Sequence, residues 1–442
     1  MSRSEQQHCR IEGTVAPGFE SVRELYEHKM RTLAEKCTQL CVYYAGEKVV
    51  DLWGTVTDEA DFSADSLINV FSSGKSLEAI AIASLVGRGL IDYNARITDY
   101  WPEFGGNGKG ELTVAELMRH EGGLPAFSRP LDPTDLLPEN IKQNRVGELI
   151  ESHVQTFRKG AANRREYHAV TRGWIVNELF RRVDPAGRTM GEYLREEISQ
   201  PLEADAIIGV KREELPRVKK VAPLGFWFQV RESLKPKFLK RKMEHNIFQL
   251  IARIIRLIPG VRNATVRKAP PPYKGMKKIA FFSDPSIAMG ETPSANTNSN
   301  ARGLAKIAAM MAAGGKWQGR EYLSEEAWKA MHADPVEKDM GFVSTSFTQG
   351  GVALFSTTGS KRGKSEKALN DGREGFYGWM GLGGSLFQWH PEHEVGFGYV
   401  PTSLNVLDLV NERGKSYQVE VMRCVAKLRA NSATPHDGQR AA

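Results

Sequence analysis

The chain has 442 residues, 41% of them hydrophobic and 26% charged, which is the composition of an ordinary globular protein and excludes a fibrous or wholly disordered one. Its net charge is +7, yet residues 231–278 carry 14 lysines and arginines against two acidic residues, a local charge of +12. Basicity confined to one segment argues against a nucleic-acid-binding protein and for one specialised insertion.

The N-terminal residues are polar and lack the apolar core of a signal peptide, and no apolar stretch approaches the length needed to span a bilayer. The four cysteines (Cys9, Cys37, Cys41 and Cys424) have neither the spacing of a zinc site nor the number of a disulfide framework. We therefore expect a cytoplasmic protein without a bound metal.

Segments with the pattern of β-strands lie near both ends of the chain. Residues 40–46 and 48–54 are joined by a turn at Gly46-Glu47. Residues 383–390 and 394–400 flank a turn and predict a hairpin. Strands at both ends with helices between them suggest one sheet interrupted by a helical insertion.

Helical patterns occupy the middle of the chain and both flanks. A buried helix follows Ser72 and ends near Gly87–Gly89, with apolar residues recurring at i, i+3, i+4, i+7 and i+8. Further helices are expected at 20–35, 113–120, 173–182, 301–315 and 406–428. We assign 1–75 and about 335–430 to a sheet-containing half, 76–334 to a mainly helical half, and 431–442 to a disordered tail.

The sharpest chemical feature is Ser72-Ser73-Gly74-Lys75, at the start of the first buried helix. Positions i and i+3 share a helix face, so the Lys75 amine can lie beside the Ser72 hydroxyl. A partly desolvated lysine can remove the serine proton, and a helix N-terminus offers backbone N–H groups to a developing oxyanion. A bare S-x-x-K also arises by chance and often only caps a helix, so the motif needs support.

Further segments follow with the order and spacing of the serine β-lactamase-like superfamily, which the chain resembles over about residues 20–425. Residues 117–125 (LMRHEGGLP) are similar to its L-x-x-H-x-x-G-L-P phrase, and residues 294–315 to its S-A-x-x-x-x-x-A-R-x-L-A-K helix. Tyr167-His168-Ala169 resembles its Y-x-N or Y-x-S element, and Trp379-Met380-Gly381 its K-T-G, H-x-G or W-x-G strand. The likeness is nearest to the class C-like branch of family VIII esterases and β-lactamase-domain proteins.

This resemblance implies an α/β fold of the α+β type: a β-lactamase/transpeptidase-like antiparallel sheet flanked by helices, plus a mainly helical domain. It implies Ser72 as nucleophile, Lys75 as general base, and Tyr167 as a partner in proton transfer whose phenolate form the nearby ammonium favours. Trp379 and Gly381 would line the substrate cleft. The backbone N–H groups of Ser72 and Leu382 would form the oxyanion hole, and no metal or organic cofactor is implied.

Two positions depart from the family pattern. Ala169 replaces an Asn or Ser whose side chain normally hydrogen-bonds the lysine or the substrate. Trp379 replaces a lysine that would anchor a carboxylate. Both changes favour an ester or an uncharged amide over an antibiotic, and they leave open a weakened or silent enzyme.

Each accessory residue also has a structural interpretation. Tyr167 and Trp379 could be ordinary half-buried or core aromatics. We expect His120 to hold a turn and His168 to be a surface or packing residue. The HPEH run at 390–393 is expected to form a hairpin turn rather than a metal site.

The basic insertion contains a lysine-rich start and an amphipathic pattern at 236–260, in which Phe248, Ile251, Ile255 and Ile258 share one face. Such a helix can lie on an anionic membrane surface, cap the active-site cleft, or pack on the core with a solvated basic rim. Residues 357–375 precede Trp379 and could form a mobile lid. Neither segment has the interleaved aromatics of a single-strand nucleic-acid site.

We therefore predict a serine hydrolase that forms an acyl-enzyme on Ser72 and acts on a small-molecule ester or amide, with an ester favoured. A peptidase or acyltransferase of the same fold is one alternative. The other is a catalytically silent binding protein, membrane-associated through 236–260. The pattern predicts no nucleic-acid partner and leaves the oligomeric state open.

Overall fold

The computed structural model describes residues 9–57, 59–157, 165–341, 343–357, 363–408 and 410–433. Within them, strands from both ends of the chain form one antiparallel sheet in the order β1-β3-β2-β16-β15-β14-β13-β12-β11. β2 pairs with β16 from Tyr44 opposite Val395 to Thr38 opposite Pro401, so this ladder joins the two ends of the chain. The strands are β1 (Arg10–Val15), β2 (Cys37–Tyr44), β3 (Glu47–Thr55), β11 (Val336–Asp339), β12 (Ser344–Phe347), β13 (Ala353–Leu354), β14 (Tyr377–Met380), β15 (Leu386–His390) and β16 (Val395–Pro401).

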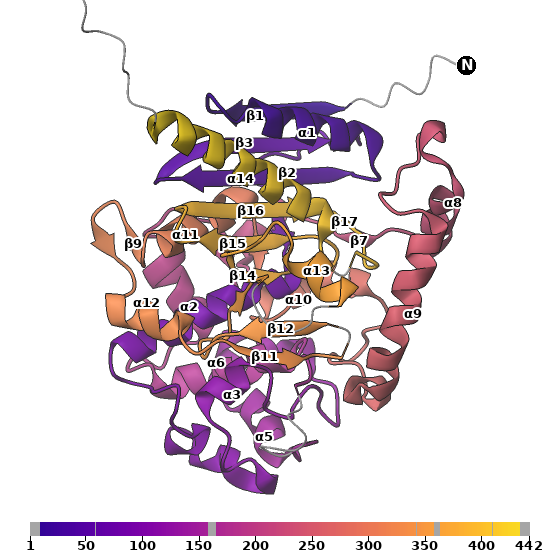
Figure 1. The fold of residues 1–442 in the computed structure, drawn as a ribbon. Helices are drawn as coiled ribbons and strands as arrows, with labels where there is room; N and C mark the ends of the chain where they lie inside the picture. The colour runs from indigo at the N-terminus through magenta and orange to yellow at the C-terminus, as the bar shows by residue number, and fades with distance from the viewer. Residues whose placement is uncertain are drawn as a thin grey trace, which may run out of the picture.

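Helices cover both faces of this sheet (Figure 1). On one face lie α1 (Glu20–Thr32) and α14 (Glu412–Ala433), whose buried side chains pack with alternate residues of β2 and β16. On the other face α11 (Ala301–Ala312) packs closely, because Gly396 and Gly398 of β16 leave room for its backbone. A Cβ on Gly396 would lie only 2.3 Å from the backbone nitrogen of Ala309. The antiparallel sheet flanked by helices that the resemblance implied is confirmed.

The mainly helical half extends from the far end of the sheet, below it in Figure 1. Its central helix, α2 (Lys75–Gly87), is buried at every position from Lys75 to Leu85. Its other helices are α3 (Val114–Met118), α4 (Pro138–Lys142), α5 (Arg145–Ser152), α6 (Thr171–Val183) and α7 (Met190–Leu194). A second sheet of short strands has the order β5 (Ala206–Ile207), β8 (Asn298–Ser299), β4 (Leu67–Asn69) and β6 (Val218–Lys219).

Shorter elements complete the described chain. They are β7 (Ala222–Pro223), β9 (Lys316–Trp317), β10 (Arg320–Glu321), β17 (Ser403–Leu404), α10 (Pro285–Met289), α12 (Glu325–His332) and α13 (Lys364–Asn370). The expected terminal helix begins at Glu412 rather than Val406. The Asp408 carboxylate accepts the N–H groups of Glu412 (2.9 Å) and Arg413 (3.1 Å), which fixes that start. Residues 434–442 of the predicted tail lie outside the described residues.

The basic insertion runs along one edge of the molecule as α8 (Phe226–Leu234), a 3₁₀ turn at Lys237–Leu239, and α9 (Ile247–Asn263) (Figure 1). The helix expected at 236–260 is therefore found at Ile247–Asn263, so it begins and ends later in the sequence than expected. Asn246 and Gln249 exchange side-chain to backbone hydrogen bonds of 2.9 Å, a capping box that begins α9 at Ile247. None of the described helices has the length and apolar character needed to cross a membrane.

Candidate active site

Ser72 lies in a single 3₁₀ turn, Phe71–Gly74, that leads from β4 into α2. Phe71 has a φ of 48°, a left-handed conformation that bulky side chains rarely adopt. The Asn69 side chain stabilises this turn by accepting the N–H of Phe71 at 2.7 Å. The sharp turn leaves Ser72 at a cavity while the helix that follows it is buried.

The Lys75 amine lies 3.4 Å from the Ser72 hydroxyl oxygen and donates to two backbone carbonyls, those of Ala169 (2.8 Å) and Ser294 (3.0 Å). A neutral amine has two N–H groups and one lone pair. When the two carbonyls accept the N–H groups, the lone pair remains for the Ser72 proton. The contact that Ala169 cannot make with a side chain is thus made by its backbone oxygen.

Burial of the Lys75 side chain lowers its pKa well below 10.5. The negative charge of Glu78 opposes this shift, and the positive charge of Arg172 adds to it. A lowered pKa favours the neutral amine, which is the form that can accept a proton. The surroundings of Lys75 therefore suit a general base rather than a fixed positive charge.

Tyr167 lies over the same amine, with the Lys75 nitrogen 4.8 Å from the centre of its ring. Its hydroxyl accepts the indole N–H of Trp379 at 2.8 Å and hydrogen-bonds with Ser72. Burial raises the pKa of Tyr167 to about 12, although these two hydrogen bonds act to lower it. Desolvation outweighs the neighbouring groups here and favours the neutral phenol over the phenolate character expected from the sequence.

The end of β14 lies against the turn that carries Ser72. Gly381 has no space for a side chain, since a Cβ would lie 2.1 Å from both Val70 O and Ser385 Oγ. Ser385 donates to Val70 O at 2.7 Å and so ties the two segments together. Within the described part of the chain no protein acceptor meets the N–H of Leu382, a residue that is 40% exposed.

Two cavities meet at Tyr167 and Met340, which line both of them. The smaller, of about 170 Å³, holds Ser72 and is lined also by Val343, Leu369, Trp379, Met380, Gly381, Leu382, Gly383, Val406, Asp408 and Asn411. The larger, of about 470 Å³, is mainly apolar and is lined also by Pro125, Ala126, Phe127, Arg129, Glu166, Ala169, Val170, Thr171, Trp174, Ala264, Val266, Ala269, Pro270, Pro271 and Pro272. The structure thus brings all six sequence-predicted site residues together, five at the smaller cavity and Lys75 directly behind Ser72.

Residues 22–415 match the family model described as Beta-lactamase. The chain belongs to the Beta-lactamase family. It is 32% identical over 291 residues to "Esterase/beta-lactamase LipL" of Mycobacterium tuberculosis (strain ATCC 25618 / H37Rv), an alignment covering 65% of this chain and 61% of that relative's length.

Solved structures share the fold of this Beta-lactamase family member over almost its whole length. A novel penicillin-binding protein homolog from Caulobacter crescentus is 25% identical with a TM-score of 0.73, covering 94% of this chain and 100% of its own. A family VIII carboxylesterase is 26% identical with a TM-score of 0.72 and the same coverage. The resemblance identified from the sequence motifs is confirmed.

Behind the nucleophile lies a buried ion pair that the sequence motifs did not indicate. Arg172 of α6 and Glu78 of α2 have fully buried side chains, and Arg172 Nε donates to the Glu78 carboxylate at 2.8 Å. Arg172 also donates to the backbone oxygens of Met118 (2.7 Å) and Lys75 (3.2 Å). This arginine therefore joins α2, α3 and α6 directly beneath the site. The sequence did offer one signal for this ion pair: Glu78 is an acidic residue within the apolar pattern of a buried helix, and a buried carboxylate needs a partner.

His120 and His168 are both buried beside the same network. His120 Nδ1 accepts the N–H of His168 at 3.1 Å, and His168 Nε2 accepts the N–H of Leu124 at 3.0 Å. Burial lowers the pKa of His120 well below its ordinary value and that of His168 to about 3. Both rings are neutral acceptors that hold backbone turns, as expected for His120, whereas His168 is a packing residue and not a surface one.

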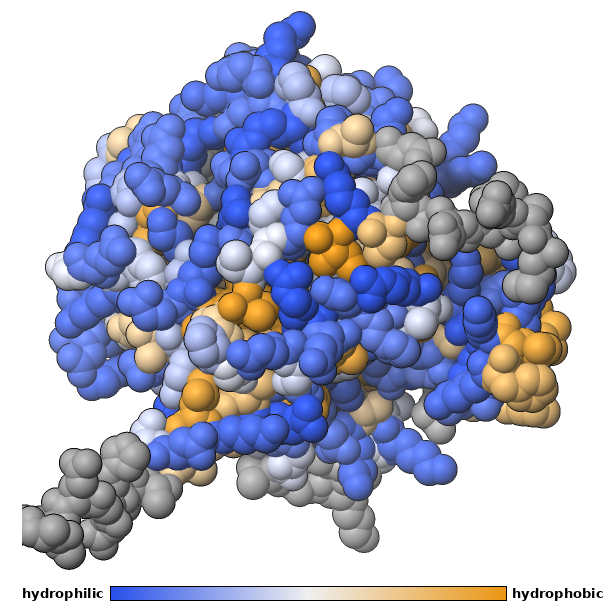
Figure 2. Space-filling view, turned by 90° about the horizontal axis from the view of Figure 1, so that it is seen from above, coloured by the Kyte–Doolittle hydropathy of each residue, from blue (hydrophilic) through white to orange (hydrophobic). Residues whose placement is uncertain are grey.

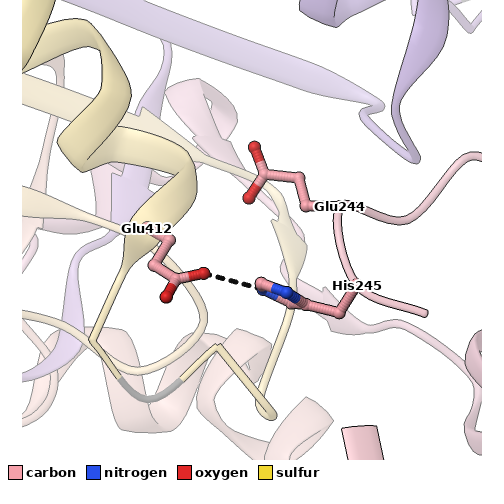
Figure 3. Close-up of side chains that lie close together, drawn as sticks. All are labelled: Glu244, His245 and Glu412. Atoms are coloured by element: carbon pink, nitrogen blue, oxygen red, sulfur yellow. Dashed lines mark ion pairs between the residues drawn. The ribbon is translucent and has the colours of Figure 1, made fainter. Parts of the chain in front are cut away.

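One group of side chains in the described residues has the composition of a metal site: Glu244, His245 and Glu412 (Figure 3). Each carboxylate already has a cationic partner, which is Arg253 for Glu412 and Lys29 for Glu244. Glu412 pairs with His245 (2.8 Å) and Arg253 (2.6 Å), and Glu244 pairs with Lys29 (2.6 Å). Burial would raise the pKa of Glu412, but His245 and Arg253 together lower it to about 2. The group is an ionic anchor between the insertion, α1 and α14.

Proposed function

We propose that this chain is a serine hydrolase that cleaves an ester by acyl transfer through Ser72. The observation that carries the proposal is the Lys75 amine, which two carbonyls hold with its lone pair available to the Ser72 hydroxyl 3.4 Å away. Burial lowers the pKa of this amine, which favours its neutral form. The esterases among the similar proteins support the same chemistry.

The reaction would proceed in two steps. Lys75 takes the proton of Ser72 while Oγ attacks the ester carbonyl, and the N–H groups of Ser72 and Leu382 stabilise the oxyanion. The proton reaches the departing alkoxide through the Tyr167 hydroxyl, which releases the alcohol and leaves an ester on Ser72. Water then attacks this ester, its proton passes to the same base, and the carboxylic acid leaves with Ser72 restored.

The cavities favour an uncharged and largely apolar substrate. The smaller cavity has no basic side chain among its described lining residues, and Trp379 stands where a carboxylate-anchoring lysine would be. The larger cavity offers mainly apolar surface beside Tyr167, enough for a bulky hydrocarbon group of an ester. We therefore place esters before amides, peptides and β-lactams as substrates.

Steady-state hydrolysis of p-nitrophenyl esters of increasing chain length tests this proposal. Ser72→Ala should abolish turnover, and Lys75→Met should lower kcat/KM by about 10²–10⁴-fold. Ser76→Ala is the matched control, because it removes a buried hydroxyl one residue beyond Lys75 that has no hydrogen-bond partner within the described residues. A folded wild-type protein that cleaves none of these esters, or a Ser72→Ala variant that keeps turnover, would contradict the proposal. The first result would favour the silent binding protein.

A further inference from the structure

Large apolar side chains face solvent along the whole basic insertion. The most exposed are Trp227 (79%), Phe238 (83%) and Phe248 (78%). Together with the other exposed apolar residues of α8, of the turn at Lys237–Leu239 and of α9 they form what we call the docking surface: Phe226, Trp227, Leu234, Phe238, Leu239, Phe248, Ile251, Ile255 and Ile258. Seen from above, hydrophobic atoms gather at the right-hand edge of the molecule, the side that α8 and α9 occupy in Figure 1 (Figure 2). Folded proteins rarely leave so many large apolar groups together in water.

The orientation of α9 is the reverse of that of an ordinary surface helix. Phe248, Ile251, Ile255 and Ile258 recur at helical spacing and point away from the protein. Arg253, on the other side, is only 17% exposed and pairs with Glu412 at 2.6 Å. The helix is thus attached to the protein through the buried Leu250 and the Arg253 ion pair, and its row of Phe248, Ile251, Ile255 and Ile258 faces outward rather than packing on the core.

Basic side chains surround this apolar face. Lys237 and Lys240 flank Phe238 and Leu239 within one exposed turn. Exposed cations of the insertion that have no acidic partner among the described residues are Lys237, Lys240, Lys242, Arg262, Arg267, Lys268, Lys277 and Lys278. The segment as a whole carries +12 in a chain of +7, so the net positive charge of the chain is concentrated in this segment.

We propose that the docking surface binds the face of an anionic lipid membrane, with its aromatic and aliphatic side chains in the headgroup region and its lysines and arginines on the acidic headgroups. Exposed Trp and Phe beside Lys and Arg match the two components of such an interface. A second copy of this chain is a poorer occupant, because two surfaces with the same strong positive charge repel each other. This inference concerns binding and does not depend on the hydrolase chemistry.

The position of the surface also has a consequence for substrate access, and this step rests on the proposed function. Ala264 follows the last residue of α9 directly, and Ala264 and Val266 line the larger apolar cavity. Val266 is itself 42% exposed, so this wall of the cavity reaches the surface of the molecule a few residues beyond α9. A bound membrane would therefore lie beside the cavity that receives the hydrocarbon group of the substrate.

Flotation with lipid vesicles tests the proposal on the full chain. We expect binding to phosphatidylglycerol-containing vesicles, and much weaker binding to pure phosphatidylcholine or at high salt. Phe238→Glu/Phe248→Glu and, separately, Lys237→Glu/Lys240→Glu should each weaken binding at least about tenfold. Val154→Glu is the control, since Val154 is 62% exposed but lies outside the docking surface. Ser72→Ala should bind as the wild type does, which separates this result from the test of catalysis.

Three results would overturn the proposal. The first is no binding of the wild-type protein to anionic vesicles. The second is equal binding by wild type and the Phe238→Glu/Phe248→Glu variant. The third is a dimer in solution that these same substitutions dissociate while vesicles bind nothing. If the surface also delivers substrate, Phe238→Glu/Phe248→Glu should lower hydrolysis of an ester embedded in vesicles but not of a water-soluble ester.

Discussion

Two regions of this protein differ in which side chains they bury: one buries polar and charged groups, and the other exposes large apolar ones. Behind Ser72, Lys75, Arg172 and Glu78 are buried, and each is held by short contacts to carbonyls or to an opposite charge. On α9, Phe248 and Ile255 face water. Burying polar groups costs free energy unless they are fully paired, and exposing apolar groups gives up the burial that stabilises folding.

The two regions differ in what offsets this cost in free energy. The buried polar groups are satisfied within the protein, so the region behind Ser72 needs no partner from outside. The apolar face of α9 has no such partner among the described residues, and we propose that a membrane surface provides one. The first region should therefore respond to substitutions through catalysis and stability, and the second through binding.

The largest expected effect is on the pH dependence of catalysis. Protonation removes the lone pair of Lys75, so kcat/KM should fall about tenfold for each pH unit below its pKa. Because burial lowers that pKa well below 10.5, activity should persist at pH values where an ordinary lysine is protonated. The measurement is kcat/KM for a water-soluble ester against pH, with the fold checked by circular dichroism. An acid limb at or above pH 10.5 would show that Lys75 is not the base in the form proposed.

Removing the buried cation beneath the site should have the largest effect on stability. Arg172→Met leaves the Glu78 carboxylate buried and unpaired, which should lower the free energy of unfolding by about 3–5 kcal/mol. Adding Glu78→Leu should restore part of that loss, because no buried charge then remains. Urea unfolding measures both, with Lys142→Met at the surface pair with Glu192 as control, for which about 0–1 kcal/mol is expected. A loss equal to that control would mean that the pair is not the junction described here.

A matched pair of substitutions within α9 tests its orientation. Leu250 is 2% exposed and Ile255 is 58% exposed. Leu250→Ala should lower the free energy of unfolding by about 2–5 kcal/mol, whereas Ile255→Ala should change it by about 0.5 kcal/mol or less. Vesicle binding should respond in the opposite order. Equal losses of stability would mean that both faces of α9 are packed in the folded protein.

The smallest effect is expected for Trp379→Phe, which keeps an aromatic ring but removes the N–H that Tyr167 accepts. Loss of one hydrogen bond should lower kcat about tenfold and leave KM nearly unchanged. Trp328→Phe is the control, because it removes a similar bond to the backbone oxygen of Met311 (2.8 Å) far from Ser72. Equal kcat values for the two variants would show that the hydrogen bond from Trp379 to Tyr167 does not contribute to proton transfer.

Much of the fold and the gathering of the site residues could be predicted from the sequence. Helix and strand periodicity indicated the sheet built from both chain ends, and the spaced motifs named the six residues that meet around Ser72. The two backbone carbonyls that accept hydrogen bonds from Lys75, those of Ala169 and Ser294, could not be predicted. Every residue has a carbonyl, and only the tertiary fold brings these two beside the amine. The sign of the pKa shift of Tyr167 was missed because burial, which dominates it, is set by tertiary packing.

The insertion shows a different limit. The helical spacing of Phe248, Ile251, Ile255 and Ile258 is evident in the sequence. Hydrophobic periodicity alone, however, does not say which side of a helix faces the protein. The ion pairs that decide it, such as Arg253 with Glu412, join residues far apart in the sequence. The start of α9 at Ile247 was missed for a more local reason, the capping box of Asn246 and Gln249, which was not recognised in the sequence.

The most direct test of the central claim is covalent labelling of Ser72. The purified chain is incubated with a fluorophosphonate, and the adduct is located by peptide mass spectrometry in wild type, Ser72→Ala, Lys75→Met and Ser76→Ala. An activated nucleophile predicts an adduct on Ser72 in the wild type and in Ser76→Ala, none in Ser72→Ala, and strongly slowed labelling in Lys75→Met. A folded wild-type protein that forms no adduct, or forms one at another serine, would contradict the claim that Ser72 and Lys75 are the reacting pair.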